Sequence, residues 1–233
     1  MTKKQSLISC IPLLILIICL LLFSPVQSQT PEIGITLTWS TDTYVPLDYS
    51  GKALPSRGSI IEIVANIDSP EINSQELVYN WFLDNIIQKA DSGQGKQVFK
   101  FNIGERTTLK RLTKVEIKNT AGTLLGSSAY LSLKAHQPEI VLEAKKYQIS
   151  ANQEVKFTAQ PYFFNIRDIN ELNYDWSLAG KAASQISSDK PNVFILKVGQ
   201  IAQSIKQDLA VWVKNKNNPL QRAQTTVEIT LNP

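Results

Sequence analysis

The sequence is poor in the residues that carry most enzyme chemistry. It has two cysteines, Cys10 and Cys19, and one histidine, His136. A zinc site needs three or four ligands drawn mainly from cysteine and histidine, and a Ser-His-Asp triad needs a histidine beside its nucleophile. The Gly-x-Ser-x-Gly, His-Glu-x-x-His and glycine-rich phosphate-binding motifs are missing as well. These absences predict no catalytic residue, no metal and no cofactor, and a protein that is not an enzyme.

An excess of charge of one sign is also missing. Without Lys3 and Lys4 the 24 basic residues become 22, against 20 acidic residues that all follow residue 28. The resulting net charge of +2 is too small for a surface that binds nucleic acid, which needs a marked excess of basic side chains. We therefore expect no nucleic-acid partner.

Long apolar runs are absent except near the N-terminus, where three features together form the pattern of an export signal. They are a basic start at Lys3 and Lys4, an apolar run over residues 7–23, and small residues at Val26 and Ser28.

The pattern predicts that residues 1–28 are a signal peptide and that the mature chain starts at Gln29. The alternative is an uncleaved anchor that contacts the membrane through residues 7–23, although this run is shorter than the ~20 residues of a spanning helix. Both cysteines lie inside the run, so the exported part must fold without disulfide bonds. We expect a protein of the cell envelope or surface, or a secreted one, and the N-terminal segment would anchor it to the membrane if it stays attached.

What the sequence does contain is a repeat, because three apolar segments recur at offsets of 95, 95 and 96 residues. A shared offset indicates two copies of one module in tandem. The matches are Tyr79, Trp81 and Leu83 with Tyr174, Trp176 and Leu178; Phe99 and Phe101 with Phe194 and Leu196; and Val115 and Ile117 with Val211 and Val213.

Apolar and polar residues alternate through both copies, which is the pattern of half-buried antiparallel strands. The sequence therefore predicts an all-β fold of two tandem β-sandwiches that follow an N-terminal signal or anchor helix. The predicted strands cover residues 33–39, 61–65, 79–83, 99–103, 115–117 and 129–133 in the first copy, and 140–142, 155–159, 174–178, 194–198, 209–213 and 227–231 in the second.

The copies set the predicted domain boundaries, because Pro-Glu-Ile opens each of them. After the signal segment the predicted parts are sandwich 1 over residues 29–134, a linker over 135–138 and sandwich 2 over 139–233. His136 falls in the linker, where we expect it to be solvated.

The Tyr-x-Trp-x-Leu strand resembles the central strand of immunoglobulin-like and PKD-type domains, in which an inward tryptophan packs across two sheets. The resemblance covers most of residues 32–133 and 139–231. The chain departs from the pattern because no cysteine pair flanks Trp81 or Trp176. The layout is also similar to that of exported two-domain bacterial proteins, and this resemblance implies a surface, adhesive or scaffold role rather than catalysis.

The two copies differ by 13 residues near their start. Pro31 and Pro138 are 107 residues apart, whereas Ile61 and Val155 are 94 apart, so the first copy carries an insertion within residues 41–58. Prolines, glycines and charged residues in this stretch favour a surface loop.

Loops at the end of a rigid scaffold are where binding residues concentrate. We therefore predict that Tyr44, Asp48, Tyr49 and Arg57 contribute to partner recognition. The alternative is a loop that covers a sheet edge with its tyrosines packed down.

Trp212 is the second candidate for binding. It lies between Val211 and Val213, which match the inward pair of the first copy, and its own counterpart is Glu116. Alternation therefore places Trp212 outward, where it could contact the first domain, a partner or a sugar ring. The alternative is that a neighbouring strand or loop covers it.

These patterns favour a non-enzymatic, exported protein that acts as a binding, adhesion or spacer module. Two alternatives stay open: a structural or accessory subunit of a surface assembly such as a pilus or secretion apparatus, and a carbohydrate-binding accessory module. The expected partner is a protein or a glycan at the cell surface.

Overall fold

The computed structural model describes residues 33–126, 128–183, 186–187 and 190–233. The predicted signal peptide, residues 1–28, and the possible anchor run, 7–23, lie outside the described residues. Ile33–Pro233 form one compact unit. In this part of the chain no helix is long and apolar enough to cross a membrane.

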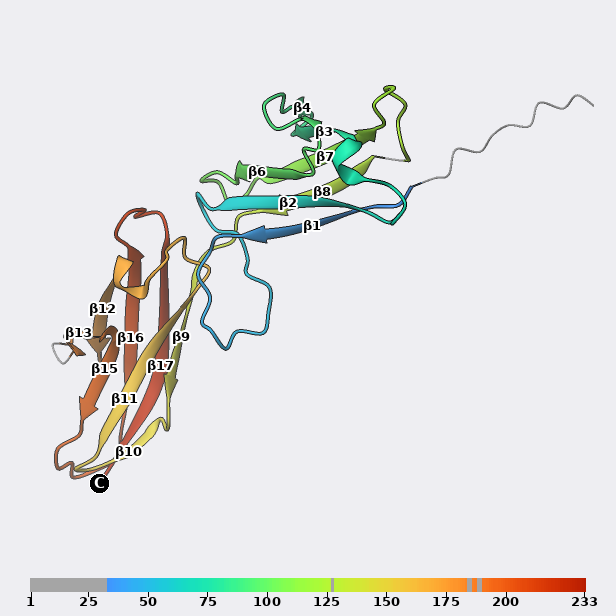
Figure 1. The fold of residues 1–233 in the computed structure, drawn as a ribbon. Helices are drawn as coiled ribbons and strands as arrows, with labels where there is room; N and C mark the ends of the chain where they lie inside the picture. Colours follow the sequence, from blue (N-terminus) through green and yellow to red (C-terminus); the bar gives the residue numbers. More distant parts are fainter. Residues whose placement is uncertain (1–32, 127, 184–185, 188–189) are drawn as a thin grey trace, which may run out of the picture. The chain divides into compact units, whose positions relative to one another are not determined.

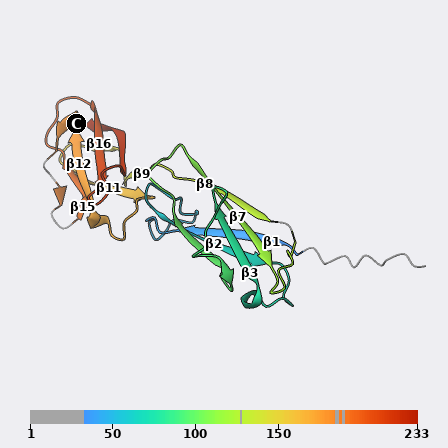
Figure 2. The same ribbon diagram turned by 90° about the horizontal axis from the view of Figure 1, so that it is seen from above.

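The first copy is a β-sandwich of two antiparallel sheets. Its strands are β1 (Ile35–Thr41), β2 (Ile60–Ile67), β3 (Val78–Leu83), β4 (Ile86–Ile87), β5 (Gly93–Gln94), β6 (Val98–Asn102), β7 (Lys110–Lys118) and β8 (Ala129–Lys134). One sheet has the order β1-β2-β6, and the other has the order β4-β3-β7-β8 with β5 also paired to β3. Both views show β1 beside β2 in the first sheet and β3 beside β7 in the second (Figure 1, Figure 2).

The second copy repeats this arrangement. Its strands are β9 (Glu139–Ala144), β10 (Gln148–Ser150), β11 (Glu154–Tyr162), β12 (Leu172–Leu178), β13 (Lys181–Ala182), β14 (Ile186–Ser187), β15 (Lys190–Lys197), β16 (Ile205–Asn215) and β17 (Arg222–Asn232). The sheets have the orders β14-β15-β11-β9 and β10-β17-β16-β12-β13. All pairings are antiparallel except that of β10 with β17, which is parallel.

The predicted fold class is confirmed, because every predicted strand is present and the strands form two tandem immunoglobulin-like sandwiches. The sequence pattern did not indicate β4, β5, β10, β13 or β14. These strands have two or three residues each, which is too short for an alternating pattern to stand out.

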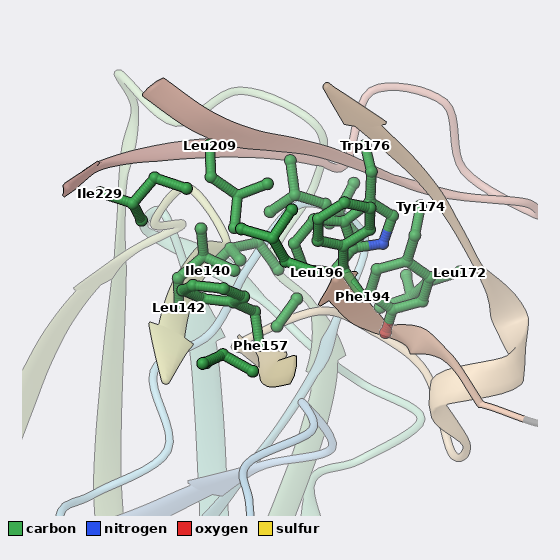
Figure 3. Packing of buried hydrophobic residues seen from close by; sticks show 14 of the residues in the cluster. Ile140, Leu142, Phe157, Leu172, Tyr174, Trp176, Phe194, Leu196, Leu209 and Ile229 are labelled. Atoms are coloured by element: carbon green, nitrogen blue, oxygen red, sulfur yellow. The ribbon is translucent and has the colours of Figure 1, made fainter. Parts of the chain in front are cut away.

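Each sandwich has its own apolar core, built from the inward side chains of both sheets. Figure 3 shows the second core, in which Trp176 and Phe194 lie against each other. Trp81 and Trp176 are 0% and 3% exposed, so the prediction that both are buried is confirmed. Trp81 stacks on Phe99 and Trp176 on Phe194, in both cases with 5.4 Å between ring centroids.

The hydrogen bonds of the two indoles also repeat. Trp81 Nε1 donates to the carbonyl oxygen of Lys96 at 2.8 Å, and Trp176 Nε1 donates to that of Pro191 at 3.3 Å. Each indole therefore satisfies its only polar group inside the core, as buried tryptophans usually do.

A capped turn precedes the tryptophan strand in both copies. The 3-10 turns η1 (Ser74–Glu76) and η2 (Ile169–Glu171) lead into β3 and β12. Asn73 and Asp168 cap them, and each side chain accepts a hydrogen bond from the backbone N–H two residues later. Asn and Asp are favoured at this position because they satisfy a free N–H of the turn. The repeat thus extends beyond its apolar residues.

Candidate functional site

The inserted loop, residues 42–58, connects β1 to β2 and pairs with the second sandwich. It is the blue loop between these strands in Figure 1. The N–H of Tyr44 donates to the carbonyl oxygen of Phe164 at 2.7 Å, and the N–H of Phe163 donates to that of Tyr44 at 2.7 Å. These two bonds join the main chain of the first copy to the segment that follows β11.

Tyrosine side chains of the inserted loop add aromatic contacts to this pairing. Tyr44 packs against the core of the second sandwich. The ring of Tyr49 meets that of Tyr162 edge to face at 5.5 Å between centroids, and that of Phe163 at 5.9 Å. Phe163 is buried, so the inserted loop covers apolar surface of the second copy.

A buried amide connects the far end of the inserted loop to the second sandwich. Gln221 is fully buried, and its Nε2 donates to Ser56 Oγ at 2.8 Å and to the carbonyl oxygen of Arg57 at 2.6 Å. Its Oε1 accepts bonds of 2.9 Å from the N–H of Asn165 and from Asn215 Nδ2. One side chain therefore satisfies polar groups of both copies, which is how buried polar atoms avoid a desolvation cost.

Arg57 and Gly58 return the chain to the first sandwich. Arg57 Nη1 donates to the carbonyl oxygen of Glu105 at 2.7 Å. Gly58 has φ +74°, a conformation that side-chain-bearing residues rarely adopt. Its carbonyl oxygen accepts from Asn102 Nδ2 at 2.9 Å and from Asn165 Nδ2 at 3.2 Å, so it too serves both copies. We call the contacts of residues 42–58 with residues 162–165 and 221 the joint.

Burial near the joint affects the pKa values of two tyrosines. Burial raises the pKa of Tyr44, and the negative charge of Asp168 raises it further. Burial also raises the pKa of Tyr174, with smaller contributions from Tyr44 and Asp168. Both hydroxyls therefore stay neutral at physiological pH.

The structure places the four predicted loop residues in different surroundings. Tyr44 and Tyr49 lie on the second sandwich, and Arg57 contacts it through its carbonyl oxygen. Asp48 is exposed. Their role in partner recognition stays a prediction, but the structure assigns three of them to the joint as well.

The linker histidine contacts the inserted loop. The N–H of His136 donates to the carbonyl oxygen of Pro55 at 2.7 Å, and His136 forms a parallel bridge with Ser56. Its side chain is half-buried rather than fully solvated. Among the described residues no group of three or more His, Cys, Asp or Glu side chains could hold a metal ion.

Trp212 lies apart from these contacts, on the outer face of the sheet that contains β12, β16 and β17. It is 50% exposed, whereas its neighbours Val211 and Val213 are buried, so the outward orientation predicted from alternation is confirmed. Across the sheet it faces Asp175 on β12 and Gln224 on β17. Its binding role stays a prediction.

Comparisons with known proteins find likeness in fold alone. The sequence matches no protein-family model and no curated protein. The three N-terminal domains of the bacteriophage RB49 highly immunogenic outer capsid protein match at 13% identity and a TM-score of 0.44, over 85% of this chain and 59% of that one. The fibronectin(III)-like modules of Clostridium thermocellum CbhA match at 14% identity and a TM-score of 0.31, over 85% and 93%. The full ectodomain of mouse nectin-like molecule 4 matches at 11% identity and a TM-score of 0.35, over 86% and 64%.

Proposed function

We propose that this chain is a non-enzymatic, exported binding, adhesion or spacer module that holds its two sandwiches together as one unit at the cell surface. The observation that carries the proposal is the joint. Domains connected by a short linker usually move relative to each other unless a substantial interface restrains them. Here main-chain hydrogen bonds, aromatic contacts and a buried amide restrain them together. Such restraint suits a protein that has to keep a distance or present a surface.

Backbone strain at the joint supports the same role. Phe163 has φ +63°, which is unusual for a bulky residue. A residue in this region costs about 1–3 kcal/mol and persists only where its surroundings fix it. Phe163 is held by its N–H bond to Tyr44 and by the ring of Tyr49. Strain retained at a contact between the two copies supports a selected role for that contact.

We predict that the two sandwiches tumble as one body in solution. Backbone ¹⁵N relaxation should then give the same rotational correlation time for residues of both sandwiches. A variant in which residues 42–58 are shortened by 13 residues, to match the second copy, should give shorter and unequal correlation times. The double variant Tyr44→Ala/Tyr49→Ala should change in the same direction with the loop length intact. Unequal correlation times in the unaltered protein would contradict the proposed unit.

Export is the second part of the proposal, and its support is the sequence of residues 1–28. We expect a tagged chain to leave the cytosol, because a basic start precedes an apolar run and a small-residue site. Cell fractionation followed by N-terminal sequencing should find a chain that starts at Gln29. A full-length chain in the membrane fraction would favour the anchor over cleavage, whereas a chain found only in the cytosol would refute export.

A second candidate function has an observation of its own. The exposed ring of Trp212 on a polar sheet face favours a carbohydrate-binding accessory role. In either case the partner that we propose is a molecule at the cell surface, and the loop residue Asp48 remains accessible to it.

A further inference from the structure

The outer face around Trp212 combines an exposed aromatic ring with polar neighbours. Trp212 is half-exposed on β16, with Asp175 opposite it on β12 and Gln224 opposite it on β17. Directly opposed residues in a sheet have Cβ atoms about 4.5–5.5 Å apart. A ligand that covers the indole would therefore come within reach of both polar side chains. Ala210, two residues before Trp212 on the same face, carries only a methyl group.

The polar side chains around the ring remain available to a ligand. Asn173, Asp175, Lys214 and Gln224 are all exposed. None of these four side chains forms a hydrogen bond or an ion pair with another residue that the structure describes. They supply a carboxylate acceptor, an ammonium donor and two amides that both donate and accept.

The matching face of the first copy is different, because its side chains satisfy one another. Glu116, the counterpart of Trp212, forms an ion pair with Lys114 at 2.6 Å. The same ammonium lies 4.1 Å from the ring centroid of Phe82. On the equivalent strands, the first copy therefore has side chains that pair with one another, whereas the second copy has an exposed indole whose polar neighbours are unpaired among the described residues.

A polar hollow lies along β12, next to Asp175, the residue opposite Trp212. Its lining includes Asn173, Tyr174, Asp175, Lys214 and Lys216. Three of these residues also belong to the surroundings of Trp212. A ligand longer than one ring could therefore continue from the indole into the hollow.

We propose that this face, formed by Trp212, Asp175, Gln224, Asn173 and Lys214, binds a neutral glycan, with one sugar ring stacked on the indole. A sugar ring has an apolar C–H face that matches the indole and a rim of hydroxyls that donate and accept hydrogen bonds. The Trp212 face likewise combines an apolar ring with side chains that donate and accept hydrogen bonds. The centre of a protein–protein interface is instead depleted of charged residues, whereas an acid and a base lie next to this ring.

The inference deepens the binding role proposed above, but it rests on the Trp212 face and not on the joint. If the two sandwiches have equal correlation times but the protein binds no glycan, the spacer role is supported and the glycan proposal fails. If the protein binds a glycan but the correlation times are unequal, the binding role is supported and the proposal of one rigid unit fails. The two failures are therefore distinguishable.

Affinity electrophoresis with soluble polysaccharides tests the proposal directly. The purified protein is run in native gels that contain mixed-linkage β-glucan, xylan, galactomannan or pullulan, with a polysaccharide-free gel as reference. We expect retardation by at least one of them. Trp212→Ala should weaken that binding on the order of tenfold or more, because tryptophans at binding centres dominate affinity. Trp212→Phe should retain part of it, and Asp175→Ala should weaken it while leaving the ring in place.

Tyr130→Ala is the matched control, because Tyr130 is an aromatic residue on β8 of the first sandwich that is 61% exposed. It should bind like the unaltered protein, and the thermal midpoint of every variant should stay close to that of the unaltered protein. Unchanged mobility of the protein in all four gels would overturn the proposal, as would equal retardation of the protein and of Trp212→Ala. A protein ligand captured through Trp212, in the absence of any retardation, would show that the face binds protein instead.

Discussion

Replacement of Trp81 or Trp176 by alanine should lower the free energy of unfolding by about 3–5 kcal/mol, the usual cost of truncating a large buried aromatic side chain. Each indole fills the space between two sheets, stacks on a phenylalanine and satisfies its N–H inside the core. Truncation removes these contacts and leaves a cavity that the sheets cannot close. Urea unfolding followed by far-ultraviolet circular dichroism measures the change.

Trp212→Ala provides the control for these two variants. The same side chain is deleted, but from a position that is 50% exposed, so the expected loss is well below that of the buried pair. A loss of less than about 1 kcal/mol at Trp81 or Trp176 would be incompatible with the packing described for the cores.

The second large effect is expected at the joint. Gln221→Ala should lower the free energy of unfolding by about 3 kcal/mol or more, because it leaves several buried polar groups without a partner, each at a cost of about 1–3 kcal/mol. The groups that lose their partner are Ser56 Oγ, the carbonyl oxygen of Arg57 and the N–H of Asn165, whereas the amide of Asn215 keeps its bond to the carbonyl oxygen of Asn165.

Gln224→Ala is the matched control for Gln221, since it removes the same side chain from an exposed position on β17. We expect it to change the free energy of unfolding by less than about 0.5 kcal/mol. Gln221→Glu is informative as well, because it keeps the shape but loses the donor to Ser56 and to Arg57. If Gln221→Ala were as stable as Gln224→Ala, the buried amide would not hold the joint together.

Alternation and the repeat predicted the two cores well, because both depend on local pattern. Tyr79, Trp81 and their counterparts occupy alternate positions of a strand, and a strand with one buried face has to show this period. The shared offset then identified Trp176 as the equivalent of Trp81. The outward position of Trp212 followed from the same rule.

The joint could not be predicted in this way, because it depends on contacts between distant segments that have no period. The sequence does hold one indirect signal. At an offset of 94, the aromatic residues Tyr162, Phe163 and Phe164 align with Asp68, Ser69 and Pro70. The insertion of the first copy and the aromatic run of the second are thus both unmatched, and in the structure they pack against each other. Two unmatched segments in a tandem repeat are candidates for mutual contact.

The inserted loop also decides where this chain can be cut into fragments that fold. Residues 42–58 belong to the first copy by sequence, but their contacts complete the surface of the second. A fragment cut at the 135–138 linker would expose the apolar ring of Phe163 as well as the amide of Gln221, and newly exposed apolar surface promotes aggregation. The segment that repeats in the sequence is therefore not the segment that we expect to fold on its own. We therefore expect the second sandwich to be less soluble alone than together with the inserted loop of the first copy.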